Sequence, residues 1–78
     1  MAQNDSGAPS ADDVRRDLID LLLEKIDRDP YPSVTMMDLV EELIGPDERG
    51  AYAAVLMDKI RSDNLPSLDM MSRVRDLT

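Results

Sequence analysis

The sequence contains no cysteine, histidine, tryptophan or phenylalanine, and its only aromatic residues are Tyr31 and Tyr52. Without cysteine the chain can form no disulfide and offers no thiolate to a metal ion. Without histidine or cysteine, a general base or nucleophile has to come from Asp, Glu, Lys, Ser or Tyr. No spacing resembles a Ser-Lys dyad or a phosphate-binding glycine loop. The sequence therefore predicts a non-catalytic protein with no cofactor and no metal site.

Long apolar stretches are also missing. No segment approaches the roughly 20 consecutive apolar residues that span a bilayer. The N-terminus carries neither the basic region nor the apolar stretch of a secretory signal. We therefore expect a cytoplasmic protein that does not associate with membranes.

Positive charge is scarce, with 9 Lys and Arg against 17 Asp and Glu and a formal net charge of −8. Ten acids and four bases lie in residues 12–44, whereas residues 46–78 carry six acids and five bases. An acidic chain is repelled by phosphate backbones, so direct binding of nucleic acid is disfavoured. The acidic excess serves either solubility or the attraction of a basic partner.

The most informative feature is an internal repeat at an offset of 34 residues. Aligning residues 12–44 with residues 46–78 gives twelve identities, where a shuffled chain gives about two or three. The identical pairs are Asp13/Asp47, Arg15/Arg49, Leu22/Leu56, Lys25/Lys59, Ile26/Ile60, Asp29/Asp63, Pro32/Pro66, Ser33/Ser67, Met36/Met70, Met37/Met71, Val40/Val74 and Leu43/Leu77. A fixed period of this kind indicates a duplicated supersecondary unit.

Apolar periodicity and helix-capping residues predict four helices. Their expected ranges are 11–28, 34–44, 47–62 and 68–77. Ser10 and Ser33 are suited to the N-cap positions of the first two helices. Proline after the first helix, and Asn64 with Pro66 after the third, should end those helices.

Each predicted helix has an apolar stripe that should face the core. The first stripe is Val14, Leu18, Leu22 and Ile26, flanked by Ile19 and Leu21. The second is Met36, Met37, Val40, Leu43 and Ile44, with Leu39 off the face. The third is Tyr52, Val55, Leu56 and Ile60. The fourth is Leu68, Met71 and Val74, with Met70 and Leu77 beside them.

These elements predict an all-α fold, a small four-helix domain made of two repeated helical hairpins. Residues 1–9 should form a disordered tail, and residues 10–78 a single domain with repeats at 12–44 and 46–78. Neither hairpin can bury its apolar faces alone, so the two should pack together, most simply with pseudo-two-fold symmetry. An intertwined homodimer is the competing arrangement, because identical hairpin surfaces can also pair between chains.

Paired methionines on the two short helices are the candidate partner-binding residues. Flexible thioether side chains adapt to varied apolar partners, although they also fill gaps in a core poor in aromatics. Adjacent residues point about 100° apart on a helix, so one member of each pair can be core and the other exposed. The candidate set is Met36, Met37, Leu39, Met70 and Met71.

The two short helices differ in charge, because Asp38 and Glu41 of the first repeat correspond to Ser72 and Arg75 of the second. If these helices lie close together, their opposite charges attract within the chain. If they lie apart, the charges can instead drive contacts between chains.

We therefore expect a protein-protein interaction or regulatory module that uses a Met-rich helical surface. The alternative is an acidic inhibitor or nucleic-acid mimic that binds a basic protein through the acidic first repeat. A third and weaker hypothesis is direct nucleic-acid binding through Arg49, Arg61, Arg73 and Arg75. The sequence does not identify the partner or decide between monomer and homodimer.

Overall fold

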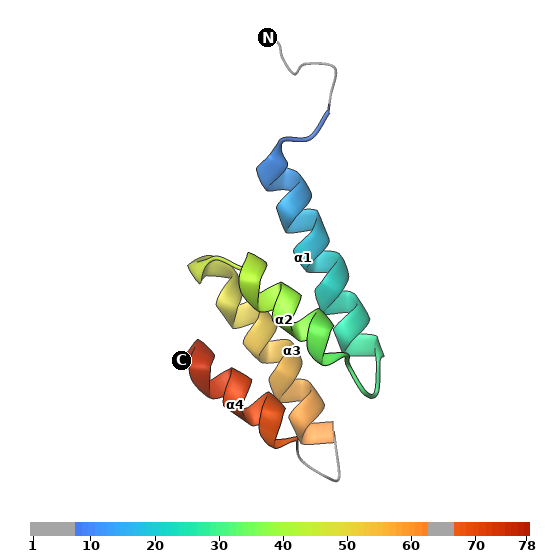
Figure 1. Cartoon of the computed structure of the whole chain (residues 1–78), viewed down its shortest axis with the longest axis vertical. Coiled ribbons are helices and arrows are strands. Elements are labelled where there is room, and N and C mark those ends of the chain that lie inside the picture. The colour runs from blue at the N-terminus through green and yellow to red at the C-terminus, as the bar shows by residue number, and fades with distance from the viewer. Residues whose placement is uncertain (1–7, 63–66) are drawn as a thin grey trace.

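The computed structural model describes residues 8–62 and 67–78 and shows four α-helices (Figure 1). They are α1 (Ala11–Arg28), α2 (Val34–Leu43), α3 (Arg49–Ser62) and α4 (Leu68–Leu77), and a 3₁₀ turn, η1 (Pro46–Glu48), precedes α3. No strand occurs in the described ranges, which confirms the all-α prediction. Asp47 lies in η1 and not in the α-helix, and Ile44 lies just beyond α2. Most of the predicted tail, and Asn64 and Pro66, fall outside the described residues.

Serine side chains cap three of the four helices. Ser10 and Asp13 form a reciprocal capping box at the start of α1, in which each side chain accepts the other residue's backbone N–H. The hydroxyl of Ser33 accepts the N–H of Met36 at 3.3 Å, and that of Ser67 accepts the N–H of Met70 at 3.1 Å. Local sequence thus fixes where these helices begin, as predicted for α1 and α2.

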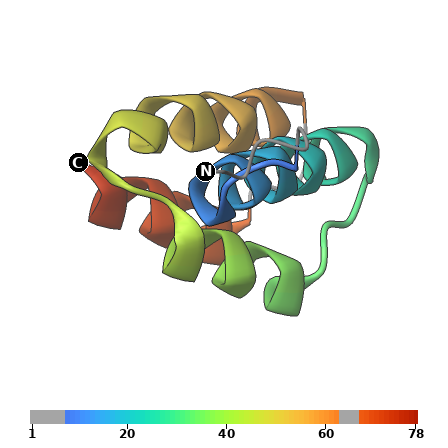
Figure 2. The same ribbon diagram turned by 90° about the horizontal axis from the view of Figure 1, so that it is seen from above.

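The hairpins lie side by side. α1 packs against α2 and α3, and α3 packs against α4. Figure 1 shows that α1 and α3 run in the same direction, and Figure 2 shows α2 and α4 on the same side of that pair. The arrangement is a parallel stack of two hairpins, so the predicted pseudo-two-fold packing is not confirmed.

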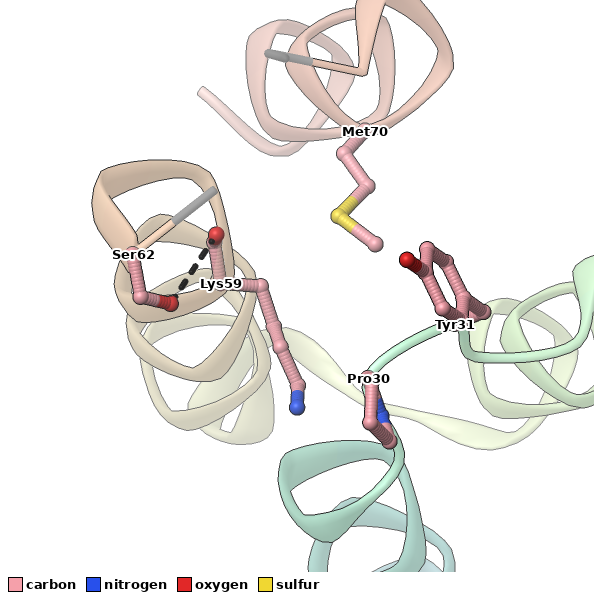
Figure 3. A pocket seen from close by; sticks show the side chains of 5 residues that line it. All are labelled: Pro30, Tyr31, Lys59, Ser62 and Met70. Atoms are coloured by element: carbon pink, nitrogen blue, oxygen red, sulfur yellow. Dashed lines mark hydrogen bonds between the residues drawn. The ribbon is translucent and has the colours of Figure 1, made fainter. Parts of the chain in front are cut away.

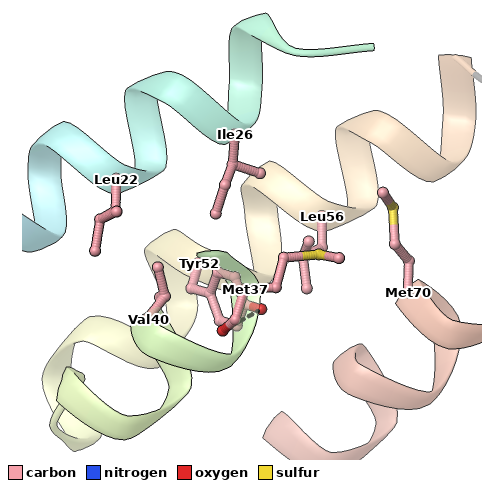
Figure 4. Packing of buried hydrophobic residues seen from close by; sticks show 7 residues of the cluster. All are labelled: Leu22, Ile26, Met37, Val40, Tyr52, Leu56 and Met70. Carbon is pink, nitrogen blue, oxygen red and sulfur yellow. Dashed lines mark hydrogen bonds between the residues drawn. The ribbon is translucent and has the colours of Figure 1, made fainter. Parts of the chain in front are cut away.

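One aliphatic and methionine-rich core joins all four helices (Figure 4). Tyr52 is its one ring and is completely buried. The buried residues are Ile19, Leu22, Ile26, Met37, Val40, Tyr52, Leu56 and Met70. None of the polar or charged residues that the structure describes is fully buried, so the core contains no ion pair that burial would make costly.

Two of the predicted apolar stripes are partly wrong. On α1 the core face is centred on Ile19, Leu22 and Ile26, while Val14 and Leu18 remain 52% and 38% exposed. On α4, Leu68 is 77% exposed and Met71 is 37% exposed, although both were expected to face inward. Apolar residues cover a wide arc of α1, and only the arc facing α2 and α3 is buried.

The repeats also differ in which methionine they bury. α2 buries Met37 and leaves Met36 half-buried, whereas α4 buries Met70, the counterpart of Met36, and exposes Met71. Likewise Tyr52 is fully buried while its counterpart Leu18 is exposed. The two short helices are therefore rotated differently against the core, and the hairpins are not equivalent in packing.

Candidate interaction surface

Arg73 on α4 organises the polar contacts between the two short helices. Its guanidinium donates to Asp38 at 2.8 Å and Glu41 at 2.7 Å on α2, and to Asp69 at 2.8 Å on its own helix. The Arg73 side chain is only 11% exposed, whereas the three carboxylates are between 32% and 54% exposed. The opposite charges of the short helices are thus close together and attract one another within the chain.

Tyr52 extends this network into the core. Its hydroxyl donates to Glu41 at 2.6 Å, which gives the one polar atom of the buried ring a partner. Desolvation, followed by the hydrogen bond to Glu41, raises the pKa of Tyr52 well above its usual value of 10.0. Partial burial acts to lower the pKa of Arg73, but its three carboxylate partners outweigh that effect and raise it.

Arg15 fastens α1 to the connection between α2 and α3. It donates to the carbonyl of Leu43 at 2.8 Å and to Glu48 at 2.8 Å, and Glu48 also accepts the N–H of Gly45 at 2.7 Å. The Glu48 hydrogen bond raises the pKa of Arg15, and the same bond, with that from Gly45, lowers the pKa of Glu48. These contacts place the Arg15 side of α1 next to the end of α2.

A small hollow of about 200 Å³ lies between the end of α1 and the start of α4 (Figure 3). Pro30, Tyr31, Lys59, Ser62 and Met70 line it. The Lys59 amine donates to the backbone carbonyls of Asp27 and, at 2.7 Å, Asp29. Lysine therefore satisfies carbonyls at the end of α1, which is a stabilising role for a cation at a helix C-terminus.

An apolar strip follows the outer flank of α1. Val14, Leu18 and Leu21 are 52%, 38% and 47% exposed, and their spacing of four and three residues puts them on one face of the helix. Leu39 on α2 is 40% exposed. We call these four residues the apolar flank. They form a concentrated set of exposed aliphatic side chains on the first hairpin, unlike singly scattered surface apolar residues.

The neighbours of α1 and α2 show that the two parts of the apolar flank adjoin. Leu23, Glu24 and Asp27 of α1 line a groove whose other wall is α3. Leu23 lies nearly opposite the strip on the helix, so α3 packs on that side of α1 and α2 lies on the other. On α2, Asp38 and Glu41 face α4, because both bond to Arg73. Leu39 lies about 100° round the helix from Asp38 and about 160° from Glu41, and therefore on the side of α2 away from α4. Both the strip and Leu39 consequently lie toward the junction of α1 with α2.

The structure divides the predicted partner-binding residues into two groups. Met37 and Met70 are core residues, 2% and 8% exposed, and their side chains pack inside the protein. Met36 is half-buried against the same core, while Leu39 and Met71 are exposed. Leu39 lies on the side of α2 away from α4, and Met71 lies on α4, so the five residues do not form one surface.

Sequence reasoning did not identify Val14, Leu18 and Leu21 as exposed candidate binding residues, because it assigned the first two to the core and the third to the edge of the core. The available signal was the excess width of the apolar arc on α1, which exceeds what two neighbouring helices can cover. It also missed Tyr52 and Glu41 as a hydrogen-bonded pair.

The chain matches no family model, and no curated protein or solved structure shows detectable similarity to it. Among residues 8–62 and 67–78, no cluster of three or more acidic side chains is arranged to hold a metal ion. Within the same ranges, no helix has the length and apolar character needed to cross a membrane.

Proposed function

We propose that this protein is a non-catalytic interaction module that binds a partner protein through the apolar flank. The observation that carries the proposal is the exposure of Val14, Leu18, Leu21 and Leu39 on adjoining sides of α1 and α2. Burying such side chains contributes about 1.5–3 kcal/mol each when exposure is lost completely, so roughly half-exposed residues retain a substantial part of that energy for a partner.

The proposal moves the binding surface away from the methionine pairs. Met37 and Met70 fill the core and contribute to folding, and flexible methionines suit the irregular space between four helices. Met36 and Leu39 stay within reach of a partner docked between α1 and α2. The module acts, on this proposal, in the cytoplasm, the compartment that the sequence predicts.

The experiment compares capture of partners from a lysate of the source cells by the wild type and two charge-matched variants. Leu18→Asp with Leu39→Asp changes the apolar flank, and Leu68→Asp with Met71→Asp changes exposed apolar residues of α4. Both pairs are exposed, so circular dichroism should show that both variants fold. We expect the flank variant alone to lose the captured partner, and equal capture by all three proteins would contradict the proposal.

An acidic inhibitor that binds a basic protein remains the second candidate, and one observation favours it. The carboxylates of Asp17, Asp20 and Asp27 on α1 are exposed and form no ion pair among the described residues. Salt separates the two functions, because a purely electrostatic complex weakens steeply with ionic strength and an apolar one does not. Direct nucleic-acid binding is less well supported, since Arg73 is occupied by three carboxylates.

We also propose that the two hairpins descend from one duplicated unit and have since diverged in role. The twelve identities support shared descent. The second hairpin buries Tyr52 where the first exposes Leu18, which is consistent with a structural role for one copy and a binding role for the other.

A further inference from the structure

We infer that the partner of the apolar flank is an amphipathic helix whose apolar stripe is bordered by lysine or arginine. The inference rests on the proposed function and adds the chemistry of the occupant. It is carried by the geometric relation between the exposed strip of α1 and the carboxylates beside it.

The strip has the spacing of a coiled-coil seam. The seam consists of Val14, Leu18, Leu21 and Lys25, which follow one another at intervals of four, three and four residues. This is the spacing of a heptad, with Val14 and Leu21 at d positions and Leu18 and Lys25 at a positions. All four are exposed. From Val14 to Lys25 the seam extends about 16 Å along the helix, which matches about three turns of a partner helix.

One border of the seam is entirely acidic. In the same heptad frame, Asp17 and Glu24 occupy g positions, and Asp13, Asp20 and Asp27 occupy the c positions behind them. All five are exposed. Among the described residues, only the Glu24 carboxylate of these five forms an ion pair, with Arg28 at 3.7 Å. The Lys59 amine bonds the backbone carbonyl of Asp27 and not its carboxylate. A helix on the seam therefore lies along a row of largely uncompensated negative charge.

The opposite border of the seam is closed by the protein itself. The e positions are Leu22, which is buried in the core, and Arg15, which donates to Leu43 and Glu48. Leu39 of α2 adds apolar surface on this side. The seam is thus open to a helix from one direction, with three aliphatic side chains and Lys25 below it. Carboxylates follow its other edge, where Glu24 and Asp27 also line the groove between α1 and α3.

This charge pattern disfavours a second copy of the chain as the occupant. A symmetric dimer brings the same patch of both subunits together, and each subunit carries a net charge of −8. If two copies paired through their seams, the acidic rows of both subunits would lie about the two-fold axis of the dimer. Like charges that face each other destabilise such a complex. A partner helix with basic residues at the matching edge gains attraction instead.

The test uses the full chain and three labelled helical peptides of about 18 residues, long enough to cover the seam. The first has leucine at a and d and lysine at e and g. The second is identical except that glutamate replaces lysine. The third keeps every lysine but has serine in place of leucine. Fluorescence anisotropy measures binding at about 0.05 M and about 0.3 M salt.

Two pairs of variants separate apolar contact from charge. Leu18→Gln with Leu21→Gln removes the seam without changing net charge, and Leu68→Gln with Met71→Gln is its matched control on α4. Asp17→Lys with Glu24→Lys reverses the acidic border, and Asp47→Lys with Asp76→Lys makes the same change in net charge on η1 and α4. All eight residues are exposed, and thermal unfolding verifies that each variant folds.

We expect the wild type to bind the lysine-and-leucine peptide at both salt concentrations and the other two peptides at least about tenfold more weakly. The seam variant should lose about tenfold in affinity, while its control binds like the wild type. The border variant should prefer the glutamate peptide, and its control should still prefer lysine.

Other outcomes overturn the inference in distinguishable ways. If lysine and glutamate peptides bind equally and the seam variant binds neither, the basic partner is wrong but the proposed function survives. If the serine peptide binds as well as the leucine peptide, bulk charge alone explains binding and both proposals fail. A wild type that sediments as a dimer, with a monomeric seam variant, identifies a second copy as the occupant. Absence of binding to all peptides also overturns the inference.

Discussion

Replacing Arg73 with methionine should be among the most destabilising changes that leave the core untouched. Methionine keeps an unbranched apolar stem in the space of the arginine stem but removes all three hydrogen bonds to Asp38, Glu41 and Asp69. Two of these bonds, to Asp38 and Glu41, join α2 to α4, two helices whose backbones do not otherwise pack against each other. The change thus isolates the electrostatic link between the two hairpins.

The size of the effect follows from the exposure of the partners. A single exposed ion pair contributes about 0.2–1 kcal/mol, because water screens it. Here three carboxylates, 32% to 54% exposed, share one arginine side chain that is 11% exposed. The conformational entropy of that arginine is therefore lost once for three ion pairs. We expect the free energy of unfolding to fall by about 2 kcal/mol, which for a domain of this size lowers Tm by roughly 8–16 °C.

The measurement is equilibrium unfolding by urea, followed by circular dichroism, with Arg75→Met as the matched control. Arg75 is 73% exposed and pairs only with the adjacent Asp76 among the described residues, so its replacement should cost less than about 0.5 kcal/mol. Raising the salt concentration to about 1 M should reduce the difference in the free energy of unfolding between the wild type and the Arg73 variant, because the electrostatic screening length falls to about 3 Å.

A double-mutant cycle with Glu41→Gln checks that the loss comes from the ion pairs. Coupling between the two changes should be about 0.5–1 kcal/mol, as for contacting residues in one network. If Arg73→Met and Arg75→Met unfold at the same urea concentration, the reasoning that the network joins the hairpins is refuted.

Two further predictions concern α3. Because burial and then Glu41 raise the pKa of Tyr52, stability should be complete below about pH 10 and fall as the pH rises above it, since the unfolded chain ionises first. Tyr52→Phe should cost about 1 kcal/mol at neutral pH and lessen that alkaline loss, as urea unfolding at about pH 8 and pH 11 can show. Gly50→Ala should raise the free energy of unfolding by about 0.5–1 kcal/mol, because an added Cβ meets nothing within 4 Å; an unchanged Tm would contradict this.

The positions of the helices were predictable because local interactions set them. Ser10 and Ser33 accept backbone N–H groups that a new helix leaves unpaired, and Pro30 and Pro32 do not continue a helix. These effects act within a few residues, so sequence reasoning recovers them. The start of α3 was less well predicted, because Pro46 begins a 3₁₀ turn stabilised by Glu48.

The division of apolar residues between core and surface was not predictable to the same degree. Met37 and Met71 occupy equivalent places in the repeat, yet one is 2% and the other 37% exposed. A methionine pair offers two faces of nearly equal hydrophobicity, and only the rotation of the helix against its neighbours chooses between them. The same uncertainty on the broad apolar arc of α1 hid the exposed strip that now forms the candidate site.

By itself, the sequence determined that the chain is helical, where most of its helices begin and end, that it is acidic, and that its two halves share twelve aligned identities. Those properties come from composition, capping and periodicity, each of which is read locally. Only the tertiary structure decided that the hairpins stack in parallel, that Arg73 joins α2 to α4, and that Val14, Leu18 and Leu21 face outward. Such outcomes depend on which helix faces lie against a neighbour, and that is settled by long-range packing of the whole chain.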